Sequence, residues 1–79
     1  MINVLFFGPI VERVGSAALK IEFVPGMTLQ NLHDELAEKY PRAFEIISLA
    51  AVNGQHVRDF SMPLMDNSEV TFMARFSGG

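Results

Sequence analysis

Cysteine and tryptophan are absent from the 79 residues, and positive charge is scarce. The missing thiols exclude disulfide bonds, thiolate metal ligands and a cysteine nucleophile. Six Lys and Arg stand against nine Asp and Glu, which gives a net charge of -3, and the basic residues are scattered along the chain. Because nucleic-acid-binding surfaces are clusters of basic residues, nucleic acid is not an expected partner.

The sequence also has no long hydrophobic run. None of its apolar stretches approaches the roughly 18 residues that a membrane helix requires, and no basic region precedes the apolar N-terminus. We therefore expect no membrane association and a cytoplasmic location, which the lack of cysteine also fits. With 49% hydrophobic residues, the chain is too apolar to be disordered. We expect one domain over residues 1–76 and a flexible tail at 77–79.

The N-terminal half predicts two strands, a helical turn and one main helix. Residues 2–7 form an apolar run that Gly8-Pro9 ends, and residues 9–14 can form one or two helical turns. Apolar and polar residues alternate over 18–24, the period of a strand. Thr28 can cap a helix whose leucines recur every three or four residues, and Pro41 ends it.

The C-terminal half predicts three further strands. Residues 49–53 read as a strand, and Asn53-Gly54 is a strong hairpin signal before a returning strand at 55–58. The last strand covers residues 69–76. One helix and a mixed sheet at this length predict an α+β fold of the β-grasp (ubiquitin-like) type, with the first and last strands adjacent in the middle of the sheet.

Alternation in these two central strands predicts an unusually apolar second face. The residues expected to face the helix are Val4, Phe6, Val70, Phe72 and Ala74. Leu5, Phe7 and Met73 then lie on the opposite face. Such a patch indicates a protein partner, although the turn at residues 9–14 is an alternative cover. We assign partner binding to Phe7, Met73, His56, Arg75 and Phe76.

Nothing in the sequence predicts an internal catalytic or metal site. His33 and His56 lie 23 residues apart without ligand-like spacing, so both are expected to have surface roles and no metal is assigned. Glu35 and Glu38 share a helix face, which solvation alone explains. The chain is therefore not expected to be an enzyme by itself.

The sequence ends in ARFSGG. Glycine has no side chain to pack against a core, and its backbone loses more conformational entropy on ordering than that of other residues. A frayed end is therefore the simplest interpretation of the glycine pair. The pair nevertheless follows a predicted central strand, which would hold and aim a short tail at its root.

The whole chain resembles the MoaD/ThiS group of ubiquitin-like sulfur carriers, and most of all the molybdopterin synthase small subunit. The matching stretches are INVLFFGPIVERVG, LAAVNGQ, PLMDNSEVTF and the terminal SGG. PIVERVG favours the molybdopterin branch over the shorter thiamine carriers. One departure is Ala74-Arg75, where the molybdopterin subunit commonly carries a proline pair.

The resemblance implies that function resides in the Gly79 carboxylate, with Gly78 and Ser77 as the tail that delivers it. In the family, an adenylating activating enzyme (MoeB-like) uses ATP on this carboxylate. A sulfur donor such as a cysteine desulfurase or rhodanese then forms a thiocarboxylate, which the large subunit (MoaE-like) consumes. No cofactor is expected to bind the carrier itself.

Three alternatives remain open on the sequence. The first is a carrier for thiamine, cysteine, tungsten cofactor or a secondary metabolite. The second is a ubiquitin-like protein modifier, and the third is a β-grasp interaction domain with an inert tail.

Overall fold

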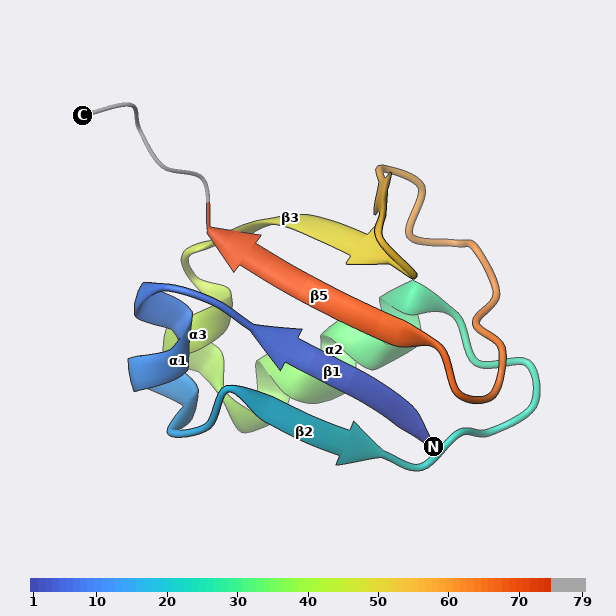
Figure 1. Ribbon diagram of the computed structural model, residues 1–79, viewed down its shortest axis with the longest axis horizontal. Coiled ribbons are helices and arrows are strands. Elements are labelled where there is room, and N and C mark those ends of the chain that lie inside the picture. The colour runs from blue at the N-terminus through green and yellow to red at the C-terminus, as the bar shows by residue number, and fades with distance from the viewer. Residues whose placement is uncertain (75–79) are drawn as a thin grey trace.

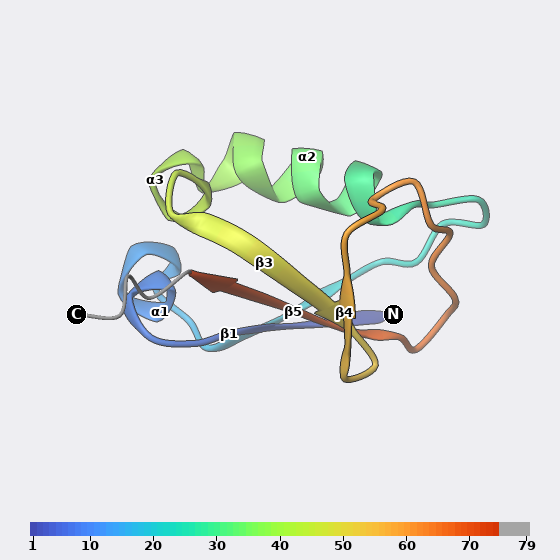
Figure 2. The same ribbon diagram turned by 90° about the horizontal axis from the view of Figure 1, so that it is seen from above.

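A computed structural model describes residues 1–74 of the chain as five strands and three helices. In chain order these are β1 (Ile2–Phe6), α1 (Pro9–Val14), β2 (Ala18–Ile21), α2 (Leu29–Lys39), α3 (Pro41–Phe44), β3 (Ile47–Val52), β4 (Gln55–Val57) and β5 (Glu69–Ala74). The strands form one mixed sheet in the order β2-β1-β5-β3-β4 (Figure 1). The main helix α2 covers one face of this sheet (Figure 2), so the predicted β-grasp fold is confirmed.

The first and last strands lie together at the centre of the sheet, as predicted. β1 runs parallel to β5, with Val4 opposite Val70 and Phe6 opposite Phe72. All four of these side chains are buried. β5 is also antiparallel to β3, so it is bonded on both edges. The strand that precedes the C-terminal segment is therefore held on both of its edges.

The core lies between the sheet and α2. Leu29, Leu32 and Leu36 of α2 are fully buried. The helix begins at a reciprocal cap: the backbone N–H of Asn31 donates to the Thr28 hydroxyl, and the Thr28 N–H donates to the Asn31 side-chain oxygen. It ends before Pro41, which starts the short α3, an element that the sequence did not predict.

Helix α1 closes one end of this core. Its Ile10 is fully buried, and α1 lies on the same side of the sheet as α2 (Figure 2). The Arg13 guanidinium donates a 2.8 Å hydrogen bond to the Arg42 carbonyl and lies 3.7 Å from the Glu45 carboxylate, which joins α1 to α3. Gly15 ends α1 at a φ of +89°, a conformation that glycine adopts without strain. Because Ile10 is buried in the core and Arg13 contacts α3, residues 9–14 do not cover the sheet face opposite α2, and the alternative that they do is wrong.

Two predicted strands differ in their bounds by more than one residue. The second ends at Ile21 rather than at residue 24, although Phe23 still packs against the core. The third begins at Ile47, two residues before the predicted start. Residues 75 and 76 of the predicted last strand lie outside the described residues, and so does the proposed tail at 77–79. Within residues 1–74, no helix is long and apolar enough to cross a membrane.

Candidate functional site

The sheet face opposite α2, which we call the open face, carries side chains from every strand. Alternation sets it: in β1, half-buried Asn3 and Leu5 lie between the buried Ile2, Val4 and Phe6. The registers extend this face across the sheet. Leu5 lies opposite Thr71, which lies opposite Ala51.

The open face becomes more apolar toward the C-terminal end of β5. At the other end the row is polar, since Asn3 pairs with both Lys20 and Glu69. The next row contains Leu5, Thr71 and Ala51. The last row contains Met73 and Leu49. An apolar surface therefore lies at the C-terminal end of β5.

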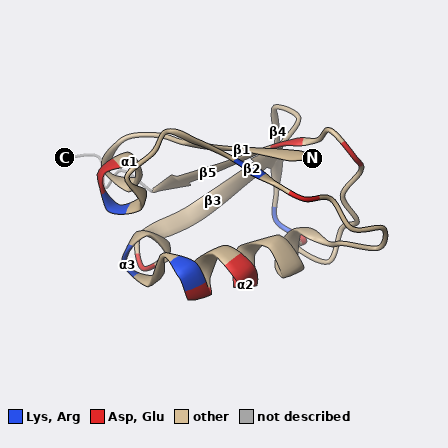
Figure 3. Cartoon of the chain, turned by 90° about the horizontal axis from the view of Figure 1, so that it is seen from below, with Lys and Arg blue, Asp and Glu red and all other residues tan. Residues whose placement is uncertain are grey.

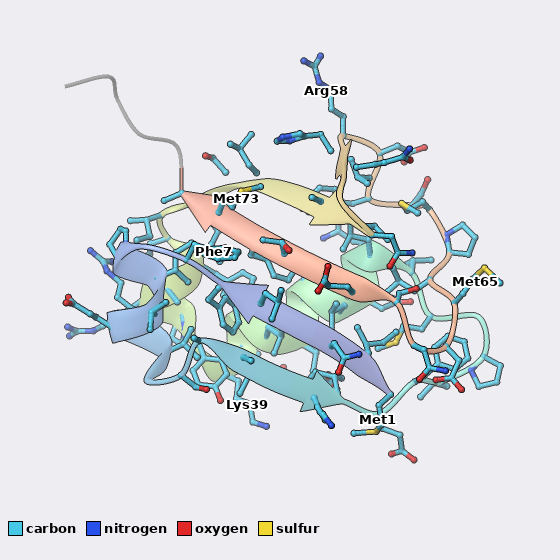
Figure 4. All side chains as sticks on the ribbon, in the orientation of Figure 1. Met1, Phe7, Lys39, Arg58, Met65 and Met73 are labelled. Atoms are coloured by element: carbon cyan, nitrogen blue, oxygen red, sulfur yellow. The ribbon has the colours of Figure 1, made fainter. Side chains whose placement is uncertain are left out.

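Phe7 and Met73 lie on this face, as predicted. Phe6 pairs with Phe72; Phe7 is the residue that follows β1, and Met73 follows Phe72 on β5. The Phe7 side chain is 56% exposed, whereas Phe6 and Phe72 on the other face are at most 1% exposed. Figure 4, which looks onto the open face, shows Phe7 and Met73 near the C-terminal end of β5. Large exposed aromatic side chains are typical of protein-binding surfaces.

His56 belongs to the middle row. It is exposed on β4 and lies opposite Ala51. Leu49 and Ala51 belong to the open face as well, but the sequence reading did not assign them. Counting alternation outward from the hairpin at Asn53-Gly54 would have placed Ala51 and Leu49 on the face opposite Val52.

A β-bulge explains why the start of β3 was harder to place. Ile47 lies opposite Ala74 and Leu49 opposite Met73, so β3 advances two residues while β5 advances one. Ser48 is the additional residue. The bulge lets Ile47 pack against the core while Leu49 remains on the open face.

Five of the predicted site residues cannot be placed. Arg75, Phe76, Ser77, Gly78 and Gly79 lie outside the described residues, so their roles stay predictions. The structure does fix where this segment starts, because Ala74 pairs with Ile47 at the end of β5.

His33 differs from its predicted surface role. Its side chain is only 27% exposed. The ring meets Phe44, Phe60 and Phe72 edge to face, with centroids 5.1, 5.7 and 6.2 Å away. It is therefore a packing residue at the border of the core, which the helical period of apolar residues could not reveal because histidine does not count toward it.

The three carboxylates with shifted pKa values lie on α2 or in the segment between β4 and β5. The Gln30 amide, and then His33, hold the pKa of Asp34 below its ordinary value. The Ser61 hydroxyl and backbone N–H lower the pKa of Asp59, and the Met1 ammonium, 2.6 Å away, lowers that of Asp66. Figure 3 shows charged residues mainly on the helices and loops; β2 and β5 carry Lys20 and Glu69, whereas β1 is uncharged. Residues 1–74 contain no cluster of three His, Asp or Glu side chains suited to a metal ion.

Comparisons with known proteins agree with this architecture. The chain is 35% identical to the molybdopterin synthase sulfur carrier subunit of Mycobacterium tuberculosis, over 99% of this chain and 96% of that protein. Its fold matches SAMP1 from Haloferax volcanii with a TM-score of 0.82 at 17% identity, covering 99% of this chain and 98% of the other.

A second solved structure is similar in fold. It is the complex of subunits 1 and 2 of the molybdopterin-converting factor from Helicobacter pylori, with a TM-score of 0.75, 24% identity, and coverage of 99% of this chain and 97% of that one. The model of the ThiS family matches residues 4–79, which is nearly the whole chain. The chain therefore belongs to the ThiS family of MoaD/ThiS-type, ubiquitin-like proteins.

Proposed function

We propose that the protein is a sulfur carrier, the small subunit of a molybdopterin synthase in molybdenum cofactor biosynthesis. The observation that carries this proposal is its 35% identity, over nearly the full length of both chains, to a protein with that role. The Gly78-Gly79 pair, which lies within the residues that the ThiS family model matches, supports it, since residues without a side chain leave an acyl group unhindered.

The proposed chemistry is acyl activation followed by sulfur transfer. The Gly79 carboxylate attacks the α-phosphate of ATP on an activating enzyme, and pyrophosphate leaves. A persulfide sulfur of a donor protein then attacks the acyl adenylate and displaces AMP, and reductive cleavage of the sulfur–sulfur bond by a thiol leaves the thiocarboxylate. A carboxylate is a poor electrophile, so the adenylate supplies the leaving group.

In this proposal the open face docks the carrier on its partners. Its apolar end, with Phe7, Leu49 and Met73, adjoins the C-terminal end of β5, so a protein bound there would lie close to Ala74, the last described residue before the C-terminal segment. The expected partners are a large subunit of the MoaE type, an activating enzyme of the MoeB type and a cysteine desulfurase or rhodanese. The complex of the two Helicobacter pylori subunits supports the first of these.

The experiment measures sulfur loading on the intact protein. Incubation with the activating enzyme, ATP and a sulfur donor should raise its mass by the difference between sulfur and oxygen. Deleting Gly79, or adding one residue after it, should abolish this gain and leave the thermal midpoint unchanged, because neither change touches the buried core. Equal loading of the extended variant would overturn the proposal.

The docking role has its own test. Phe7→Asp should weaken binding to the large subunit at least tenfold, because the complex would desolvate a charge. Val24→Asp introduces the same charge at an equally exposed apolar side chain in the segment between β2 and α2, so it is the matched control and should bind normally. If both variants bind as the natural protein does, the open face is not the docking surface.

A second candidate function is protein modification. It is favoured by the fold match to SAMP1, which is named as a small archaeal modifier protein in Haloferax volcanii. The same adenylated Gly79 would then be attacked by a lysine amine, and AMP would leave as an isopeptide bond forms. Lysine adducts ending in Gly79 in cell extracts would support this function, whereas thiocarboxylate without adducts supports the sulfur carrier.

A further inference from the structure

A cleft lies at the sheet edge formed by β3 and β4. Its volume is about 500 Å³, and its lining consists of Ser48, Leu49, Ala50, His56, Val57, Arg58 and Phe60. One of the lining residues, His56, belongs to the open face, because it lies opposite Ala51.

The edge of β3 is only partly paired in this cleft. β4 bonds to β3 at Ala50, Ala51 and Val52 alone. Over residues 47–49, the outer side of β3 has no strand partner among residues 1–74. An unpaired stretch of strand backbone can accept another extended segment as an additional strand, and here the added segment must accommodate the bulge at Ser48.

The charge of the cleft is opposite to that of the protein. The protein carries a net charge of -3, yet Arg58 and His56 are the ionisable residues that line this cleft. The neighbouring Asp59 carboxylate accepts hydrogen bonds from the backbone N–H and hydroxyl of Ser61. In the part of the chain that the structure describes, Arg58 forms no ion pair, and Figure 4 shows its side chain reaching outward beyond β4.

The sheet's other edge is built differently. β2 borders a depression lined by Lys20, Glu22, Glu35, Glu38 and Lys39, where three carboxylates surround the two lysines. A segment with an acidic side chain would meet repulsion there. The charge pattern therefore distinguishes the two edges.

We propose that the β3–β4 cleft binds an extended, acidic segment of a partner protein, which adds to the outer edge of β3 at residues 47–49. Backbone hydrogen bonds to β3 hold the segment. An Asp or Glu side chain of the segment pairs with Arg58, and Phe60 supplies an apolar contact. The inference does not depend on the tail chemistry.

The test uses three blocked peptides and amide chemical shifts of the full-length protein. The probe is acetyl-Thr-Val-Glu-Val-Thr-amide. One comparison peptide has lysine in place of the glutamate, and the other has proline in place of both valines, which removes two N–H donors. The glutamate peptide should shift the amides of Ser48, Leu49 and Arg58, and it should bind at least fivefold more tightly than either comparison peptide.

Charge reversal provides the control. Arg58→Glu should invert the preference, so that the lysine peptide binds more tightly than the glutamate peptide. Lys39→Glu changes the net charge equally but lies on α2, outside the cleft, and should keep the original preference. The amide spectrum of each variant also reports whether it is folded.

Several results would overturn the proposal. They are an absence of shifts, shifts confined to β2, equal binding of the glutamate and lysine peptides, or equal effects of the two charge reversals. Undiminished binding of the proline peptide would overturn strand addition in particular.

Discussion

Phe72 and Phe7 allow the assignment of the two sheet faces to be tested with chemically identical substitutions. Phe72 is fully buried, and its ring lies 5.2 Å from that of Phe44 and 6.4 Å from that of Phe6. Truncating a buried phenylalanine to alanine costs about 3–5 kcal/mol. A domain of this length has roughly 4–12 kcal/mol of stability in total, at about 0.05–0.15 kcal/mol per residue. Phe72→Ala should therefore remove a large fraction of the free energy of unfolding.

Phe7→Ala deletes the same atoms from a side chain that is 56% exposed. Its cost should stay within about 0.5 kcal/mol, the usual range at exposed positions. Urea unfolding followed by circular dichroism separates the two outcomes. With a slope near 1 kcal/mol/M, the midpoint should fall by about 3–5 M for Phe72→Ala, or the protein should be unfolded in buffer, and by less than about 0.5 M for Phe7→Ala. Similar midpoints for the two variants would refute the assignment of the faces.

Three other predictions concern local features. Thr28→Ala should cost about 1 kcal/mol, because it removes the acceptor of the Asn31 N–H; an unchanged thermal midpoint would show that the cap is dispensable. The pKa of Asp59 should lie below its ordinary value of 3.8. The hydrogen bonds from Ser61 to the ionised carboxylate therefore stabilise the fold above pH 3.8, and this contribution is lost as the pH falls through the lowered pKa. Ser61→Ala should bring the titration, followed by carboxyl chemical shift, back toward 3.8, and a persistently low value would contradict the assigned cause. Deleting Ser48 should preserve the fold, because it removes the bulge and leaves Ile47 and Leu49 on their present faces; an unfolded product would indicate that the bulge is required.

The faces of the central strands could be predicted because each side chain of a strand points to one of only two faces of the sheet. β1 and β5 are regular, so one buried residue in each fixes all the others. Met73 follows this alternation within β5, and Phe7, the residue after β1, continues the alternation of β1. β3 contains a bulge, and a pattern with period two loses its phase at an additional residue.

The remaining differences come from tertiary contacts. Alternation and helical period describe an element by itself, and neither states which neighbour it contacts. α1 lies on the core side because Ile10 enters the core and Arg13 reaches α3. His33 is drawn into packing by Phe44, Phe60 and Phe72, which come from three separate parts of the chain.

The arrangement separates the residues that stabilise the protein from those proposed to act. The buried hydrophobic side chains of the sheet lie almost entirely between the sheet and α2, whereas Phe7, Met73 and His56 lie on the open face. β5 is paired on both edges, with β1 on one side and β3 on the other. A force or a binding event at the end of β5 must disrupt both ladders before it disturbs the core. If Gly79 acts as proposed, deleting it should abolish sulfur transfer and leave the stability of residues 1–74 unchanged, and an activity lost together with stability would point to the core instead.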